Sequence, residues 1–183
     1  MTDLVILFSG GADSTLLLKI AEKINRKPLA LMIDYNQLHI QELEFAKRYC
    51  EKNKIKNMTI KIDGYEVNSA LTGNGEKGIY QGVNIHNVPQ RNSIFLTLAA
   101  GIAESKNITE IWFGANWQDF ELDFPDCLQP YIGKMNELLK ISGAKPITVY
   151  APLLGMSKEL IKEMLKLYSI NSNDIFSGYG EFE

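Results

Sequence analysis

Short apolar runs alternate along this chain with amphipathic segments of helical spacing, and this alternation limits the possible folds more than any other feature. The apolar runs are rich in β-branched and aromatic residues and predict five strands: Leu4–Phe8, Leu29–Tyr35, Met58–Ile62, Ile111–Gly114 and Ile147–Tyr150. The intervening segments predict five helices: Ser14–Asn25, Gln41–Asn53, Asn92–Ser105, Gln129–Ile141 and Ser157–Tyr168. The pattern favours an α/β fold, a doubly wound and mostly parallel five-stranded sheet with helices on both faces. Ligands of such sheets bind at the carboxyl ends of the strands, near a reversal of strand order.

Length and composition indicate one soluble globular domain over residues 1–183. Hydrophobic residues make up 45% and charged residues 22%, which excludes intrinsic disorder. The net charge of −3 disfavours a protein that stably binds nucleic-acid backbones. The chain has no apolar run of about 18 residues and no basic segment before its first apolar run. We therefore expect a cytoplasmic protein with no membrane association.

Cys50 and Cys127 are far apart in sequence and form no metal-ligand spacing with each other or with the two histidines. We expect two reduced thiols and no structural metal. Residues 64–87 interrupt the strand–helix alternation and contain five of the 14 glycines. A loop of this length and composition predicts a segment that covers the substrate. A surface loop without such a role is the alternative.

The hexad Ser9-Gly10-Gly11-Ala12-Asp13-Ser14 lies between the first predicted strand and the first helix. Two glycines let the backbone turn tightly and bring N–H groups close to an anion. The helix N-terminus adds unpaired donors, the two serines add hydroxyl groups, and Asp13 can hold Mg²⁺. The hexad is neither a Walker A motif nor the GxGxxG of dinucleotide folds. A glycine turn capped by Ser or Asp is the alternative to this phosphate loop.

The complete hexad resembles the PP-loop of ATP pyrophosphatases, which cleave ATP to AMP and pyrophosphate. This resemblance implies an adenine nucleotide alpha-hydrolase-like fold, with the loop at the pyrophosphate end of ATP. Lys158 opens the last predicted helix, where a cation is unfavourable against the helix dipole, so a phosphate partner is expected rather than solvent alone. The candidate ATP-binding residues are Phe8, Ser9, Gly10, Gly11, Ala12, Asp13, Ser14, Thr15, Asp34 and Lys158.

Further strings extend the resemblance over nearly the whole chain. They are Asp34-Tyr35-Asn36-Gln37-Leu38-His39 with Glu42, Ser69–Thr72, Val88-Pro89-Gln90-Arg91-Asn92, Gly114-Ala115-Asn116, Asp119, Phe124-Pro125-Asp126-Cys127, Ala151-Pro152-Leu153 and Ser157-Lys158. In this order and spacing the chain is similar to the 7-cyano-7-deazaguanine synthase (QueC) family. The resemblance implies a ligase that converts 7-carboxy-7-deazaguanine, ammonia and ATP into the nitrile, through an acyl-adenylate and an amide. It also implies a homodimer.

The resemblance and the chemistry together suggest residue roles. Arg91 would neutralise the α-phosphate or clamp the substrate carboxylate, and with Asp13 and Lys158 it completes the candidate catalytic set; a loop-capping arginine is the alternative. Asn92 would cap the third helix as well as contact the substrate. Asp119 and Asp126 could accept N–H groups of the guanine-like face, although Asp126 could instead cap the following helix. The remaining substrate-binding candidates are Gln37, His39, Glu42, Asn116 and Phe124, of which His39 and Phe124 could be ordinary loop and packing residues.

Two departures from the family pattern bear on function. Family members usually continue into a four-cysteine zinc segment, whereas here residues 176–180 read Phe-Ser-Gly-Tyr-Gly, so no zinc site is expected. Leu128 follows the Pro-Asp-Cys string where a basic residue is common. These departures leave open an enzyme that stops at the amide or passes the activated group to another acceptor. A non-catalytic nucleotide-binding module is a further alternative, and a tRNA-modifying enzyme is disfavoured by the acidic charge.

Overall fold

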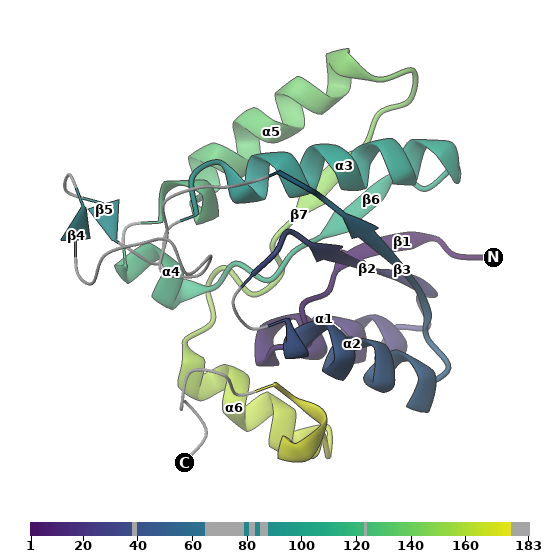
Figure 1. Ribbon diagram of the computed structural model, residues 1–183, viewed down its shortest axis with the longest axis vertical. Coiled ribbons are helices and arrows are strands. Elements are labelled where there is room, and N and C mark those ends of the chain that lie inside the picture. Colours follow the sequence, from purple (N-terminus) through teal and green to yellow (C-terminus); the bar gives the residue numbers. More distant parts are fainter. Residues whose placement is uncertain (38–39, 65–78, 81–82, 85–87, 123, 177–183) are drawn as a thin grey trace.

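A computed structural model describes residues 1–37, 40–64, 79–80, 83–84, 88–122 and 124–176 of the chain (Figure 1). Its main sheet has the strand order β3-β2-β1-β6-β7, and all neighbouring pairs are parallel. The strands are β1 (Leu4–Leu7), β2 (Pro28–Asp34), β3 (Lys56–Lys61), β6 (Glu110–Trp112) and β7 (Thr148–Tyr150). The five parallel strands confirm the predicted sheet.

Helices cover both faces of this sheet, as the alternation predicted. On one face lie α1 (Ala12–Lys23), α2 (Gln41–Lys52) and α6 (Lys158–Leu167), and on the other lie α3 (Arg91–Ser105) and α5 (Gln129–Ser142) (Figure 1). Each face has its own apolar core. The first core includes Leu16, Leu17 and Ile161, and the second includes Leu96 and Ile132. Burial on both faces explains why the β1 and β2 sequences are almost continuously apolar.

The chain folds into several short elements that the sequence pattern did not predict. They are the helix α4 (Trp117–Glu121), the 3₁₀ turns η2 (Pro125–Cys127) and η3 (Ser172–Asp174), and an antiparallel pair formed by β4 (Ile79–Tyr80) and β5 (Val83–Asn84). Each has at most five residues, too few for a hydrophobic period to be recognised. The rest of the predicted covering loop, residues 65–78, 81–82 and 85–87, lies outside the described residues, as do 177–183.

Element boundaries differ from the predictions by one or two residues in most cases. β3 begins at Lys56 rather than Met58, because it is an edge strand whose exposed positions carry polar side chains. α1 begins at Ala12 rather than Ser14, and α3 at Arg91 rather than Asn92. Within the described part of the chain, no helix has the length and apolar character needed to cross a bilayer.

Candidate functional site

The candidate site lies where the strand order reverses. From β1 the chain adds β2 and β3 on one side of the sheet, and it later returns to add β6 and β7 on the other side. The carboxyl end of β1 leads into Ser9–Gly11, and the end of the adjacent β6 leads into Gly114–Asn116. This arrangement confirms the predicted reversal and brings the phosphate loop beside the segment after β6.

Gly10 and Gly11 shape the phosphate loop, as predicted. Gly10 has a φ of +89°, and a Cβ there would lie 3.0 Å from the Glu42 carbonyl oxygen and 3.2 Å from the Ala46 nitrogen. Only glycine tolerates both this backbone conformation and this close contact with α2. Gly11 is the N-cap of α1 and has no side chain to cap the helix, so it leaves the amide donors of the first turn available to an anion.

The two serine hydroxyls hold the loop in shape. The Ser14 hydroxyl donates to the Gly11 carbonyl oxygen at 3.2 Å and lies 3.2 Å from the Ser9 hydroxyl. The Gly11 amide donates to Ser9 Oγ at 3.3 Å. The hydroxyls therefore lie among the loop amides. Each has one proton, so Ser14 can donate to a phosphate oxygen only by releasing the Gly11 carbonyl oxygen.

Asp13 and Lys158 meet across the site although 145 positions separate them. Lys158 Nζ lies 2.8 Å from Asp13 Oδ2, and each side chain is about a quarter exposed, 22% and 24%. Ser157 caps α6 by accepting from the Leu160 amide, which places Lys158 in the first turn. The partner of Lys158 in this structure is thus a carboxylate. Its predicted phosphate partner remains untested.

Asn116 and Asp119 form a capping box at the start of α4. Asn116 Oδ1 accepts from the Gln118 amide, and Asp119 Oδ2 accepts from the Asn116 amide, both at 2.9 Å. Burial raises the pKa of Asp119, and the Asp13 charge raises it further, while Lys158 and Arg91 act in the opposite direction. Asp119 therefore lies within electrostatic reach of Asp13, Lys158 and Arg91.

Arg91 opens α3, and its guanidinium lies beside the Tyr35 hydroxyl at the carboxyl end of β2. Burial acts to lower the pKa of the guanidinium, but Tyr35 and the Asp126 carboxylate outweigh it and keep the pKa above its ordinary value. The cation is thus permanently charged. Tyr35, whose ring packs edge-on against Phe95 at 5.2 Å, had no predicted role. The sequence signal that could have identified Tyr35 is its position at the end of a predicted buried strand.

Glu42 lies in the first turn of α2 and is half-buried. Burial raises the pKa of its carboxyl group to about 7, although the Arg91 charge acts to lower it. The carboxyl group can therefore gain or lose a proton near neutral pH. Its proximity to Arg91 and to the phosphate loop agrees with its predicted place at the site.

The predicted capping role of Asn92 is wrong. Gln90, in the left-handed conformation at φ +57°, precedes the helix, and Asn92 is already inside it. The Asn92 side-chain amide donates to the Asp126 carbonyl oxygen at 3.5 Å and to Cys127 Sγ at 3.4 Å, which joins α3 to η2. Burial raises the pKa of the Cys127 thiol above its usual range, so the thiol is neutral.

The remaining candidates divide between the site and the core. Gln37 is buried and accepts from the Tyr35 amide at 3.1 Å, and Asp34 accepts from the Asn36 amide at the same distance. Both therefore shape the turn after β2. Phe8 is buried in one core, Phe124 is partly buried against the other, and Thr15 is fully buried. The binding roles of these three residues stay predictions. The N-cap of α5 is Leu128, so the alternative in which Asp126 caps this helix is wrong. His39 lies outside the described residues.

The profile of the family "Queuosine biosynthesis protein QueC" matches residues 3–182, almost the whole chain. The chain belongs to the QueC family. Among the QueC relatives, the 7-cyano-7-deazaguanine synthase of Picrophilus torridus is 36% identical over 175 residues, covering 90% of this chain and 73% of the relative. That of Marinobacter nauticus is 35% identical, covering 91% of this chain and 79% of the relative.

Solved structures confirm the fold of this QueC chain. An NH3-dependent NAD synthetase from Campylobacter jejuni superposes with a TM-score of 0.63 at 19% identity, covering 96% of this chain and 68% of that chain. The U34-tRNA thiolase NcsA from Methanococcus maripaludis gives 0.63 at 14% identity, covering 93% of this chain and 57% of that chain. At such low identity these structures support the PP-loop architecture and nothing finer.

Proposed function

We propose that this chain is an ATP-dependent carbon–nitrogen ligase that converts 7-carboxy-7-deazaguanine and ammonia into 7-cyano-7-deazaguanine, with release of AMP and pyrophosphate. Membership of the QueC family supports the reaction. The structural observation that carries it is the contact of Asp13 with Lys158 at the phosphate loop, with Asp119 within electrostatic reach of both residues and of Arg91. Cations and helix amides at this point suit a reaction whose leaving group is pyrophosphate.

The phosphate loop binds the end of ATP that leaves. The amides at the N-terminus of α1 and the hydroxyls of Ser9 and Ser14 donate to the β- and γ-phosphates. Lys158 adds a positive charge within reach of the same phosphates, because it lies 2.8 Å from Asp13 at the mouth of the loop. These groups stabilise the negative charge that grows on pyrophosphate as its bond to the α-phosphorus breaks.

Asp13 suits a magnesium ion. Its carboxylate is partly exposed at the mouth of the loop, and carboxylate oxygens are the ligands that a hard cation such as Mg²⁺ prefers. Asp13 would hold Mg²⁺, which supplies charge neutralisation of the phosphates when bound. With Mg²⁺ on the Asp13 carboxylate, the Lys158 ammonium group would pair with the phosphates instead of with Asp13.

Arg91 acts at the reacting carboxylate or at the α-phosphate. A carboxylate oxygen attacks the α-phosphorus, pyrophosphate leaves, and an acyl-adenylate forms. Ammonia attacks the carbonyl carbon, loses a proton and displaces AMP, giving the amide. The amide oxygen then attacks the α-phosphorus of a second ATP, and a second pyrophosphate leaves. Loss of AMP and of the two N–H protons from this adenylylated amide yields the nitrile. Arg91 neutralises charge at each adenylation because it stays protonated beside Tyr35.

The deazaguanine ring would lie against residues from three elements. Asp126 and Asp119 can accept its N–H groups, and Gln37 and Glu42 follow β2 at the same edge of the sheet. His39 is a further candidate from the sequence. Residues 64–87 would cover it. We further propose that ammonia arrives from solution or from a separate partner, and that the chain works in the cytoplasm as a homodimer without zinc.

Mass spectrometry of a reaction containing the purified protein, Mg-ATP, ammonium and 7-carboxy-7-deazaguanine tests the proposal. A nitrile together with AMP and pyrophosphate is the expected result. Absence of AMP would overturn it for this substrate. Accumulation of the amide would favour the enzyme that stops one step earlier, for which Leu128 at the start of α5 is the supporting observation. Asp13→Asn should abolish turnover, whereas a non-catalytic nucleotide-binding module would have no turnover to lose.

A further inference from the structure

Residues 171–176, which follow α6, run back across α2 to the phosphate loop (Figure 1). The segment contains η3, and its Ile175 is only 5% exposed and packs into the core shared by α1, α2 and α6. Phe176, the next residue, donates a hydrogen bond from its backbone amide to the Gly10 carbonyl oxygen of the phosphate loop, at 3.0 Å. A segment without an assigned role therefore contacts the phosphate loop directly.

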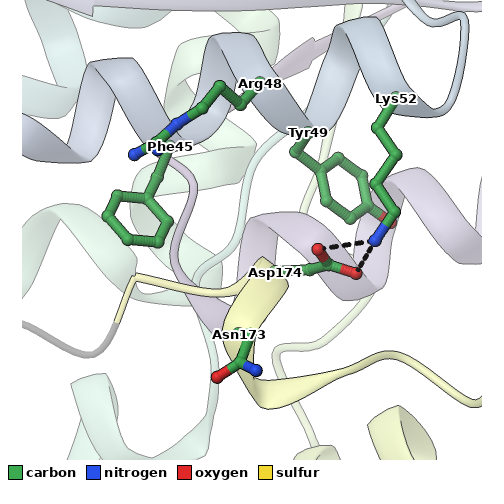
Figure 2. Close-up of a pocket in the computed structure, with 6 residues that line it drawn as sticks. All are labelled: Phe45, Arg48, Tyr49, Lys52, Asn173 and Asp174. Carbon is green, nitrogen blue, oxygen red and sulfur yellow. Dashed lines mark hydrogen bonds and ion pairs between the residues drawn. The ribbon is translucent and has the colours of Figure 1, made fainter.

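Two side-chain contacts attach this 171–176 segment to α2. At one end Lys52 Nζ lies 2.8 and 2.7 Å from the two Asp174 carboxylate oxygens (Figure 2). At the other end the Phe176 ring meets Phe45 edge-on at 5.6 Å. A pocket of roughly 230 Å³ separates the two contacts and is lined by Phe45, Arg48, Tyr49, Lys52, Asn173 and Asp174. The ion pair therefore joins η3 to α2 across a gap in the packing.

The hydrogen bond from Phe176 fixes the direction of a phosphate-loop amide. In a planar trans peptide, the carbonyl oxygen and the following N–H point in opposite directions. Because the Gly10 carbonyl points to the Phe176 amide, the Gly11 N–H points the other way, where Ser9 Oγ accepts it at 3.3 Å. On its other side Gly10 faces α2, which leaves no room for a side chain, since a Cβ on Gly10 would lie 3.0 Å from the Glu42 carbonyl oxygen and 3.2 Å from the Ala46 nitrogen. The loop peptide is thus held from two sides.

We infer that the 171–176 segment positions the ATP-binding loop, with the Phe176 amide and the Asp174 carboxylate as positioning residues. The inference rests on the proposed function only for its ligand, ATP. Loss of either contact leaves the loop residues in place but lets the Gly10–Gly11 peptide rotate. Binding of ATP must then also order this peptide, which costs conformational entropy, so the affinity for ATP falls. The rate of the chemical step at saturating ATP is retained.

Phe176→Pro and Phe176→Ala separate the amide from the ring. Both variants remove the ring contact with Phe45, but only proline removes the N–H donor. We expect Mg-ATP, titrated calorimetrically without the carboxylate substrate, to bind roughly three- to tenfold more weakly to Phe176→Pro than to Phe176→Ala. The KM for ATP should rise by the same factor, with kcat changed less than about twofold. Equal ATP affinity in the two variants would overturn the role of the amide.

Asp174→Asn tests the second contact without altering the backbone. We expect a roughly two- to fivefold weaker affinity for Mg-ATP. Glu137→Gln is the matched control, because Glu137 pairs with Lys134 at 2.8 Å on the surface of α5. The positioning role is contradicted if Asp174→Asn lowers the melting temperature while binding ATP like the control. Wild-type protein that binds ATP but forms no AMP would refute the proposed reaction and leave this inference standing. Wild-type protein that binds no ATP would overturn both.

Discussion

Tyr35 shows how one residue outside the predicted set determines the behaviour of a predicted one. Its hydroxyl lies beside the Arg91 guanidinium, and its ring packs against Phe95, so Tyr35 is placed to orient the guanidinium at the carboxyl end of β2. Tyr35→Phe keeps the ring and removes the acceptor. We expect kcat/KM for the carboxylate substrate to fall roughly three- to tenfold, because Arg91 loses its orientation and not its charge.

Tyr150→Phe is the control for this substitution. Tyr150 is 48% exposed on the edge strand β7, and its backbone, not its hydroxyl, pairs with Phe113. Its activity should match the wild type in the same steady-state assay. Unchanged kinetics in Tyr35→Phe would show that the Arg91 position does not depend on the hydroxyl.

Glu42 predicts a pH dependence of stability. Its folded-state pKa of about 7 lies above the ordinary 4.5, so the native state retains a proton that the unfolded state has lost. Stability should therefore fall as pH rises from about 4.5 to about 7, and the loss is complete above that range. Urea unfolding at pH 5 and pH 7 measures this slope. Glu42→Gln should flatten it, and an equal slope in both proteins would contradict the assignment.

The phosphate loop is the element whose geometry depends most on glycine. Gly10→Ala combines a positive φ with a Cβ 3.0 Å from the Glu42 carbonyl oxygen, so the loop must move off α2. We expect a loss of about 1–3 kcal/mol in the free energy of unfolding, together with weaker ATP binding. Chemical denaturation and calorimetric titration measure the two effects.

Gly133→Ala provides the opposite control. Gly133 lies inside α5, and a Cβ there would meet no atom within 4 Å. Alanine should raise the free energy of unfolding by about 0.5–1 kcal/mol, because it restricts the unfolded chain and favours the helix. An equal change in the free energy of unfolding for both variants would show that a Cβ at Gly10 is accommodated against α2 without a loss of stability.

At the scale of the whole molecule, the site joins distant parts of the chain. Asp13 comes from the first helix, Arg91 from the middle of the chain and Lys158 from the last helix. A ligand bound among them should stabilise the entire fold. We expect Mg-ATP at about 100 times its Kd to add about 2.7 kcal/mol, a rise of roughly 5–10 °C in melting temperature. Lys158→Ala should reduce this rise, and an identical rise would place Lys158 outside the ATP site.

The sequence by itself determined the elements and the phosphate loop. Strands, helices and the Ser9–Ser14 hexad depend on neighbours within a few positions, so period and local chemistry predict them. The short α4 was missed because its capping box is formed by Asn116 and Asp119 in a segment with no apolar period. Asn92 was misjudged for a related reason, since its hydrogen-bond partners lie 34 and 35 positions away.

Only the tertiary structure decided which side chains meet. The pairing of Asp13 with Lys158, of Tyr35 with Arg91 and of Gly10 with Phe176 depends on strand order and on which helices share a face. Strand order is set by packing two apolar layers on one sheet, and no local pattern encodes it. The sequence thus predicted the chemical groups of the site, while the fold determined their partners, their burial and the pKa shifts that burial produces.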